Sequence, residues 1–431
     1  MSLPPRESPG PGGPPGAPPH FIHGAETIPP ADTYYVNDYP YSQPVEIDFI
    51  CLGTIFVLVI LYQVYQRVIA RRIRSPLLKR IHDKLGRARS FLVALAFFVI
   101  LEVVLSIAVY YHPINQVRPD PVSLWRIHAT YTPWPGARIF KVNSLGLVND
   151  ELPQEKPEGV VRIFALGDSR TLGGAGTSPP RTYPRVLEDE LRRANKDVKI
   201  EVIQGAQSGY SSYQGLSLFK NVGLRYAPDI VTVALGYQDN EFAWAPDKAH
   251  MCDSYPLSVA RGLLYKSNLF LVLRKNLLNL IKYRRNEQDA AHEVNRVSLE
   301  DYDENLSRII ELARAADMQV VLIELPYNRY ADGMTHPKDM KYREALRQVA
   351  ERHAGSGDVY HLDLYDLFWP NRPDGRRDEG GEVPSAAELG EKGRENFVDD
   401  CHMKPIGHRA VGRQLAEFFE RNGIIERVHG P

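Results

Sequence analysis

The stretch RIFALGDSRTLGGAG, from Arg162 to Gly176, decides the fold. It begins as a short apolar run, which is typical of a buried strand, and continues into a turn of small residues. An acid and a hydroxyl, Asp168 and Ser169, lie at the junction. Ser169 is therefore either the N-cap of a following helix or a reactive side chain presented at the carboxyl end of a strand.

Four more apolar runs follow the first and alternate with amphipathic stretches. The five predicted strands begin at residues 160, 198, 229, 319 and 359. Helical patterns from Thr182, Ser298 and Asp339 fit between them. This alternation predicts an α/β domain with a five-stranded parallel sheet over residues 160–431. The stretch 242–297 is too long for a plain connection and predicts a helical insertion near the sheet edge.

Two apolar runs precede this domain. Residues 49–65 carry no charge, and residues 91–111 approach the roughly 20 residues that a spanning helix needs. The loop 67–90 between them carries nine Lys or Arg and one acid, which favours the cytoplasm. We therefore predict a transmembrane hairpin over 46–112. We expect Glu102, the one charge in the second run, to pack against the first.

This hairpin would place both tails and the α/β domain outside the cytoplasm, anchored in the cytoplasmic (inner) membrane and facing the periplasm of a cell with two membranes. Residues 1–45 are rich in Pro and Gly and predict a disordered tail. Residues 113–159 form the predicted linker and N-terminal extension. A formal net charge of -1 gives no indication of nucleic-acid binding.

Polar residues that follow the predicted strands carry the candidate chemistry. Asp399 and His402 are three residues apart, so on a turn the carboxylate reaches the imidazole. An imidazole oriented in this way can take a proton from a serine hydroxyl. We predict that Ser169, Asp399 and His402 form a catalytic triad. Taken singly, Ser169 is equally explained as a helix cap, and the other two as a surface ion pair.

The set resembles the SGNH (GDSL-like) hydrolase family over about residues 160–419. Three blocks carry the likeness: Gly-Asp-Ser ending at Ser169, SGYSS at 208–212, and Asp-x-x-His ending at His402. The resemblance implies a flavodoxin-like three-layer α/β/α domain with Ser169 as nucleophile. It also implies an oxyanion hole that uses the backbone N–H groups of Ser169 and Gly209. A second histidine, in the KPIGH continuation at 404–408, is expected to be structural.

The third block departs from the family pattern. The usual Gly-x-Asn-Asp is replaced by GYQD at 236–239, followed by Asn240. Gln238 can donate an amide hydrogen to the oxyanion from a longer arm, and we predict that it does. Two alternatives stay open: the loop shifts so that Asn240 donates, or the oxyanion hole is impaired, which typically costs about a hundredfold or more in rate.

The three cysteines exclude a disulfide scaffold. Cys252 and Cys401 both lie in the α/β domain, and a bridge between them is chemically permitted. His402 and His408 are six residues apart without a matching Cys or carboxylate pattern, so we predict no metal site. No cofactor is predicted.

These observations predict a membrane-tethered serine ester hydrolase that works through an acyl-enzyme. An O-acetylesterase or similar enzyme acting on an acylated cell-envelope or exported glycan fits a tethered enzyme, since such a substrate is too large to import. The first alternative is an O-acyltransferase that modifies an exported polysaccharide. Others are a non-catalytic binding or scaffold domain and a nucleotide- or phosphate-binding module, which lacks the expected Gly-rich spacing. Oligomeric state is left open.

Overall fold

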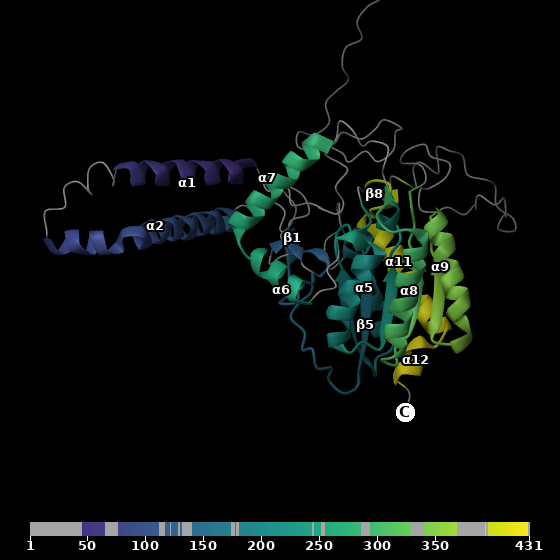
Figure 1. The fold of residues 1–431 in the computed structure, drawn as a ribbon. Coiled ribbons are helices and arrows are strands. Elements are labelled where there is room, and N and C mark those ends of the chain that lie inside the picture. The colour runs from purple at the N-terminus through teal and green to yellow at the C-terminus, as the bar shows by residue number, and fades with distance from the viewer. Residues whose placement is uncertain are drawn as a thin grey trace, which may run out of the picture.

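The computed structural model describes residues 45–64, 76–111, 117–120, 122–127, 130–131, 140–173, 177, 181–243, 245–250, 255–285, 294–328, 340–368, 393 and 395–429. At the centre of this part of the chain lies a five-stranded parallel sheet (Figure 1). Its strands are β5 (Val160–Gly167), β6 (Lys199–Ala206), β7 (Ile230–Ala234), β10 (Gln319–Glu324) and β11 (Val359–Asp363). The prediction of an α/β fold with five parallel strands is confirmed.

The strands lie in the order β11-β10-β7-β5-β6, which is the flavodoxin-like order. Strand β5 is therefore flanked by β6 and β7, and the chain turns in opposite directions on its two sides. In such sheets, ligands bind outside the carboxyl ends of the strands at this switch point. The segments that follow β5, β6 and β7 thus meet at one edge of the sheet.

Helices cover both faces of the sheet and make three layers. One helical layer contains α5 (Ser212–Asn221), α8 (Leu299–Arg314) and α9 (Met340–His353), and the other contains α4 (Tyr183–Ala194), α11 (Pro405–Arg421) and α12 (Ile424–His429). Along β5, Phe164 and Leu166 enter the first core, while Ile163 and Ala165 enter the second. Burial on both faces explains why the strands are continuous apolar runs.

Short elements connect these layers. The α-helix α3 (Ser169–Leu172) follows β5, and four 3₁₀ turns are η5 (Gly223–Tyr226), η6 (Gln238–Asn240), η7 (Asp247–Ala249) and η8 (Ala354–Ser356). The first and third of the longer connections after β5 and β7 thus begin as single helical turns, which is where the candidate site residues lie.

The segment predicted as a linker and extension contains two small antiparallel pairs. They are β1 (Val117–Asp120) with β2 (Leu124–Ile127), and β3 (Thr130–Tyr131) with β4 (Phe140–Lys141). Trp125 and Ile127 are buried in the core beside α5. The Trp125 indole donates a hydrogen bond to the Ser208 carbonyl oxygen at 3.0 Å. This strand therefore belongs to the packed domain and supports the loop after β6.

Helices α1 (Val45–Val64) and α2 (Pro76–Tyr111) pack against each other and extend away from the α/β domain (Figure 1). Within α2, Phe91–Ala108 is long and apolar enough to cross a membrane by length and composition. In α1 the corresponding apolar stretch, Ile50–Val64, is shorter. The structure therefore does not establish the two-helix transmembrane hairpin. Because α2 begins at Pro76, the second half of the predicted basic loop is helical.

The predicted helical insertion is present. Strands β8 (Phe242–Ala243) and β9 (Val294–Asn295) pair at its base, and it contains α6 (Tyr255–Leu264) and α7 (Asn268–Arg285). Helix α7 packs against α2, a contact that the sequence analysis did not anticipate.

The expectation for Glu102 requires correction, because its carboxylate faces α7 instead of α1. It accepts hydrogen bonds from the backbone N–H groups of Asn268 at 2.7 Å and Leu269 at 3.1 Å, and from the Ser267 hydroxyl at 2.7 Å. The first N–H groups of a helix have no partner within the helix, and a carboxylate satisfies them. Glu102 thus caps α7 from a neighbouring helix.

Candidate active site

The turn between β5 and α3 settles which residue caps the helix. Asp168 is the N-cap, and its carboxylate accepts a hydrogen bond from the Arg170 N–H at 2.9 Å. Ser169 is the first helical residue, so the interpretation of Ser169 as the cap is wrong. A Cβ atom at Gly167 would lie 2.0 Å from the Thr171 hydroxyl oxygen, which explains the glycine at this turn. Capping by Asp168 leaves the Ser169 hydroxyl available for another partner.

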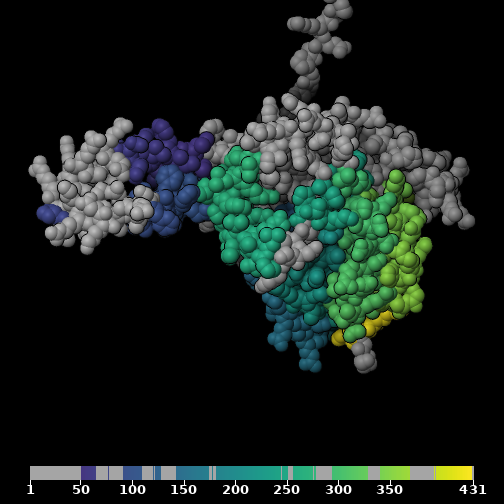
Figure 2. All heavy atoms as spheres, viewed as in Figure 1, coloured from purple at the N-terminus to yellow at the C-terminus, as the bar shows by residue number. Residues whose placement is uncertain are grey.

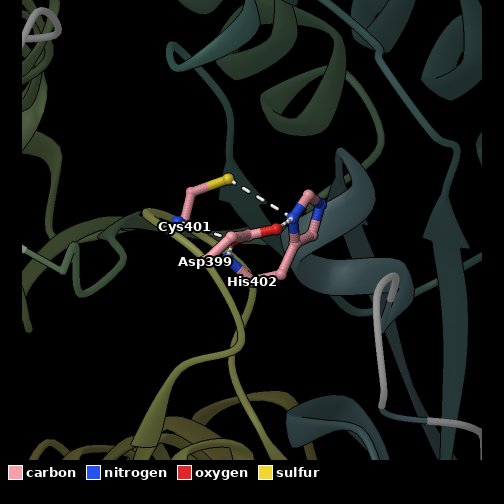
Figure 3. A group of neighbouring side chains, drawn as sticks. All are labelled: Asp399, Cys401 and His402. Atoms are coloured by element: carbon pink, nitrogen blue, oxygen red, sulfur yellow. Dashed lines mark hydrogen bonds and ion pairs between the residues drawn. The ribbon is translucent and has the colours of Figure 1, made fainter. Parts of the chain in front are cut away.

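That partner is His402. The distance from Ser169 Oγ to His402 Nε2 is 2.9 Å, and His402 Nδ1 lies 2.7 Å from Asp399 Oδ2 (Figure 3 draws the second pair). The other carboxylate oxygen, Asp399 Oδ1, accepts the backbone N–H groups of Cys401 at 3.0 Å and His402 at 2.7 Å. The structure therefore brings the three predicted triad residues together in one hydrogen-bonded chain.

The electrostatics of this chain favour a basic imidazole. Burial alone would lower the pKa of His402, but the hydrogen bond to Asp399 and the charges of Asp399, Asp400 and Asp168 outweigh it and raise the pKa above 6.5. For Asp399, burial would raise the pKa, and the hydrogen bonds and charge of His402 lower it below 3.8. A carboxylate that stays ionised can stabilise the imidazolium that forms when His402 takes a proton.

Residues that the sequence analysis missed hold the loop that carries the histidine. Asn328, just after β10, donates its backbone N–H to the Asp400 carbonyl at 2.8 Å and its side-chain amide to the Asp399 carbonyl at 3.0 Å. The Tyr237 hydroxyl donates to the Asp400 carboxylate at 2.6 Å. Their position directly after predicted strands was the available signal, since such residues meet at one sheet edge.

Gly209 lies on the loop after β6 with a φ of +72°, a left-handed conformation that favours glycine. Gln238 begins the 3₁₀ turn η6 after β7. Because β6 and β7 flank β5, both loops lie at the same sheet edge as Ser169. Their roles in an oxyanion hole stay predictions.

The neighbours of Gln238 are engaged elsewhere. Asp239 is buried and accepts the backbone N–H of Ser212 at 2.9 Å, while the Asn240 amide oxygen accepts from Asn295 at 3.3 Å. Burial raises the pKa of Asp239 to about 6, against the lowering effect of its hydrogen bonds with Ser212. Because a 3₁₀ helix has three residues per turn, Gln238 projects in a third direction. This geometry favours Gln238 over Asn240 as the oxyanion donor.

Arg296, at the end of the insertion, links the two loops and was also missed. Its guanidinium donates to the Gly209 carbonyl at 2.8 Å and to the Gln238 carbonyl at 3.4 Å. It forms a fully buried ion pair with Asp247 at 2.9 Å and lies 5.2 Å from the centre of the Trp125 ring. The sequence held no local signal for this pair, since the two charges are 49 residues apart.

His408 has the structural role that the family resemblance implied. Its Nδ1 accepts the Tyr183 backbone N–H at 3.2 Å, and the two rings stack with their centres 6.2 Å apart. Burial lowers the pKa of His408 to about 3, so the ring is neutral at physiological pH. It joins α4 to α11 and leaves proton transfer to His402.

One polar group of the three in Figure 3 belongs to Cys401, whose Sγ lies 3.6 Å from His402 Nδ1. Cys401 is a free thiol, and Cys252 lies outside the described residues. The donor atoms of Asp399, Cys401 and His402 lie within 4.8 Å of one another, close enough to share a metal ion. However, burial and the charges of Asp400 and Asp399 raise the pKa of the thiol well above 9.0, which disfavours the thiolate that metals bind. The arrangement is better suited to proton transfer.

Comparison with known proteins gives a family match. The model of the GDSL-like lipase/acylhydrolase family matches residues 165–410, which is more than half of the chain. The comparison with curated proteins gave no match.

Solved structures share the fold at low identity. LAE5, an alpha/beta hydrolase from the metagenome of Lake Arreo, Spain, is 15% identical, covers 61% of this chain and 95% of its own, and has a TM-score of 0.37. The lipase/acylhydrolase from Enterococcus faecalis is 18% identical, with coverages of 61% and 96% and a TM-score of 0.35. The acetylxylan esterase Axe2 from Geobacillus stearothermophilus is 14% identical, with coverages of 61% and 94% and a TM-score of 0.36.

Proposed function

Since the chain belongs to the GDSL-like lipase/acylhydrolase family, we propose that it is a membrane-tethered serine esterase that removes acyl groups, such as acetyl, from an exported or cell-envelope glycan. Family membership, predicted from the sequence, is confirmed, and the chain is an ester-hydrolysing enzyme. The observation that carries the assignment of the site is the continuous hydrogen-bonded chain from Ser169 through His402 to Asp399.

In the proposed reaction, Ser169 Oγ attacks the acyl carbonyl carbon while His402 Nε2 takes the hydroxyl proton. The carbonyl oxygen becomes an oxyanion, which the backbone N–H groups of Ser169 and Gly209 and the Gln238 amide would stabilise. Collapse of this intermediate breaks the ester bond. The proton on His402 passes to the departing alcohol, and an acyl-enzyme remains.

Water then repeats the sequence on the acyl-enzyme. His402 takes a proton from the water as its oxygen attacks the acyl carbon, and returns a proton to Ser169 Oγ as the carboxylic acid leaves. Throughout, Asp399 keeps Nδ1 of the ring protonated and stabilises its positive charge.

Exposure of the two N-terminal helices supports membrane tethering. Only 11% of the Phe91–Ala108 window is buried, whereas an apolar core helix of a soluble protein would be mostly covered. Large apolar side chains are exposed on α1 as well, among them Leu52, Phe56 and Leu61. The basic segment 67–90 between the helices favours a cytoplasmic position for it, which would leave the esterase domain outside.

An extracytoplasmic site suits a polymeric substrate that never enters the cell, and this is the basis for proposing a glycan. The test is acetate release from acetylated envelope glycans by the full chain in detergent, with Ser169→Ala as the inactive variant. Ser217→Ala, which removes a serine hydroxyl from α5 outside the triad, is the matched control. We expect release by the wild type and the control only.

Adding a sugar with free hydroxyls to the same assay separates hydrolysis from transfer. Hydrolysis predicts free acetate in both cases, whereas appearance of acetyl groups on the added sugar would replace the esterase proposal with a transferase. Absence of acetate release from every acetylated glycan, with a simple aryl acetate still hydrolysed, would refute the glycan and retain the esterase.

A further inference from the structure

The insertion helices α6 and α7 expose apolar side chains that the α/β domain does not cover. Leu263 is 63% exposed and Leu273 is 57% exposed. The other exposed large apolar residues of the two helices are Leu257, Val259, Leu264 and Leu277. Contiguous exposure of this kind on a folded domain marks a surface for an apolar partner.

The charge of the same segment is one-sided. Residues 255–285 contain seven Lys or Arg and no Asp or Glu, although acids and bases are nearly equal over the whole chain, at 53 and 52. Two of the basic residues are Arg261 on α6 and Lys266 in the turn that follows it. An apolar surface with basic residues around it is complementary to an anionic phospholipid bilayer.

This surface is continuous with α2. Leu269 and Val272 of α7 pack with Leu101 and Leu105 of α2, and Cys51 of α1 completes the cluster. The turn between α6 and α7 lies against this end of α2 in Figure 1, and the surfaces of the insertion and α2 adjoin in Figure 2.

The Glu102 cap gives the depth of this contact. Glu102 precedes Ala108, the last residue of the apolar window, by six positions, or about 9 Å along a helix. Amphipathic helices at a bilayer interface lie about 5–10 Å deep in the boundary between headgroups and acyl chains. The cap also satisfies the N–H groups at the start of α7, which lipid could not do.

We propose that α6 and α7 form a monotopic hairpin whose turn is embedded in the outer leaflet of an anionic phospholipid bilayer, beside α2. This inference rests on the membrane tethering proposed above. The hairpin fixes the orientation of the esterase domain on the bilayer, because its base ends at Arg296, which holds the loops of Gly209 and Gln238.

The test uses the full chain reconstituted in vesicles of phosphatidylcholine and phosphatidylglycerol. A fluorescent amino acid, dansylalanine, replaces Leu263, Val99 or Met340 in separate proteins by stop-codon suppression, so the cysteines stay unchanged. Val99 lies within the α2 window, and Met340 is an exposed apolar residue of α9 on the far side of the domain (Figure 1). Lipids with a nitroxide high or low on the acyl chain quench the probe according to its depth.

We expect the shallow nitroxide to reduce the fluorescence at position 263 to about half and the deep one to reduce it less, as for an interfacial helix. Position 99 should be quenched most by the deep nitroxide, and position 340 by neither. Quenching at 99 without quenching at 263 would overturn the hairpin and retain the anchor. Absence of quenching at both would overturn the anchor and, with it, the hairpin.

Discussion

The protonation of His402 governs the proposed chemistry at the scale of single residues. Its neutral form is the base, and the carboxylate of Asp399 raises its pKa above 6.5. Activity therefore rises with pH through that raised pKa. We expect kcat/KM for an aryl acetate to have an ascending limb centred above pH 6.5.

Asp399→Asn should move this limb to lower pH, because burial then lowers the His402 pKa without an opposing charge. It should also reduce kcat by at least about a hundredfold, since the ring loses the partner that orients it. A pH–rate profile of the variant measures both effects. An unshifted limb would show that His402 is not the titrating base.

Arg296 is expected to act as a positioning residue for the oxyanion loops. The double variant Arg296→Met/Asp247→Asn removes the ion pair without leaving an unpaired buried charge. Because the Gly209 and Gln238 carbonyls lose a shared donor, kcat should fall by about tenfold to a hundredfold with a much smaller change in KM. Steady-state kinetics and circular dichroism on the same preparation test this. A folded variant with unchanged kcat would contradict it.

His408 should make the fold sensitive to acid. The unfolded chain binds a proton at the ordinary pKa of 6.5, whereas the buried ring binds one only near 3. Stability is therefore lost as the pH falls below 6.5, by about 1.4 kcal/mol for each pH unit until the folded pKa is reached. In urea unfolding near pH 5.5 and pH 7.5, His408→Gln should lose about 1 kcal/mol less than the wild type between the two. An equal loss would contradict the prediction.

Among the elements, the sheet was the easiest to predict. Each strand is buried on both faces, so its sequence is a continuous apolar run that periodicity detects. The Asp-x-x-His spacing likewise encodes a local turn, and the positions of Asp399 and His402 followed from it. Elements whose position depends on distant partners escaped: Trp125 is buried by the loop at Ser208, which lies 83 residues away.

The contact between α2 and α7 is testable as an element. Glu102→Leu removes the acceptor from the N–H groups of Asn268 and Leu269, and loss of a helix cap typically costs about 1–2 kcal/mol. Hydrogen exchange at the start of α7 should accelerate by about tenfold in Glu102→Leu and by less in Glu102→Gln, which keeps an acceptor oxygen. Identical exchange in all three proteins would show that the cap does not stabilise α7.

The whole molecule combines a domain of known family with an arrangement that sequence patterns describe only in part. Apolar runs indicated where helices might cross a membrane, because that depends on length and composition. They did not indicate that Glu102 would cap the insertion, since the choice between α1 and α7 as its partner depends on tertiary packing. The connection from α2 through α7 to Arg296 spans the molecule from its proposed anchor to its proposed site.

Trapping of the nucleophile tests the central claim most directly, because all of the chemistry depends on Ser169. The full chain is treated with a fluorophosphonate, digested and mapped by mass spectrometry, alongside Ser169→Ala and Ser217→Ala. The account predicts one phosphonylated residue, Ser169, in the wild type and in Ser217→Ala, with parallel loss of aryl acetate hydrolysis, and no adduct in Ser169→Ala. An adduct on another residue, or full esterase activity in Ser169→Ala, would contradict it.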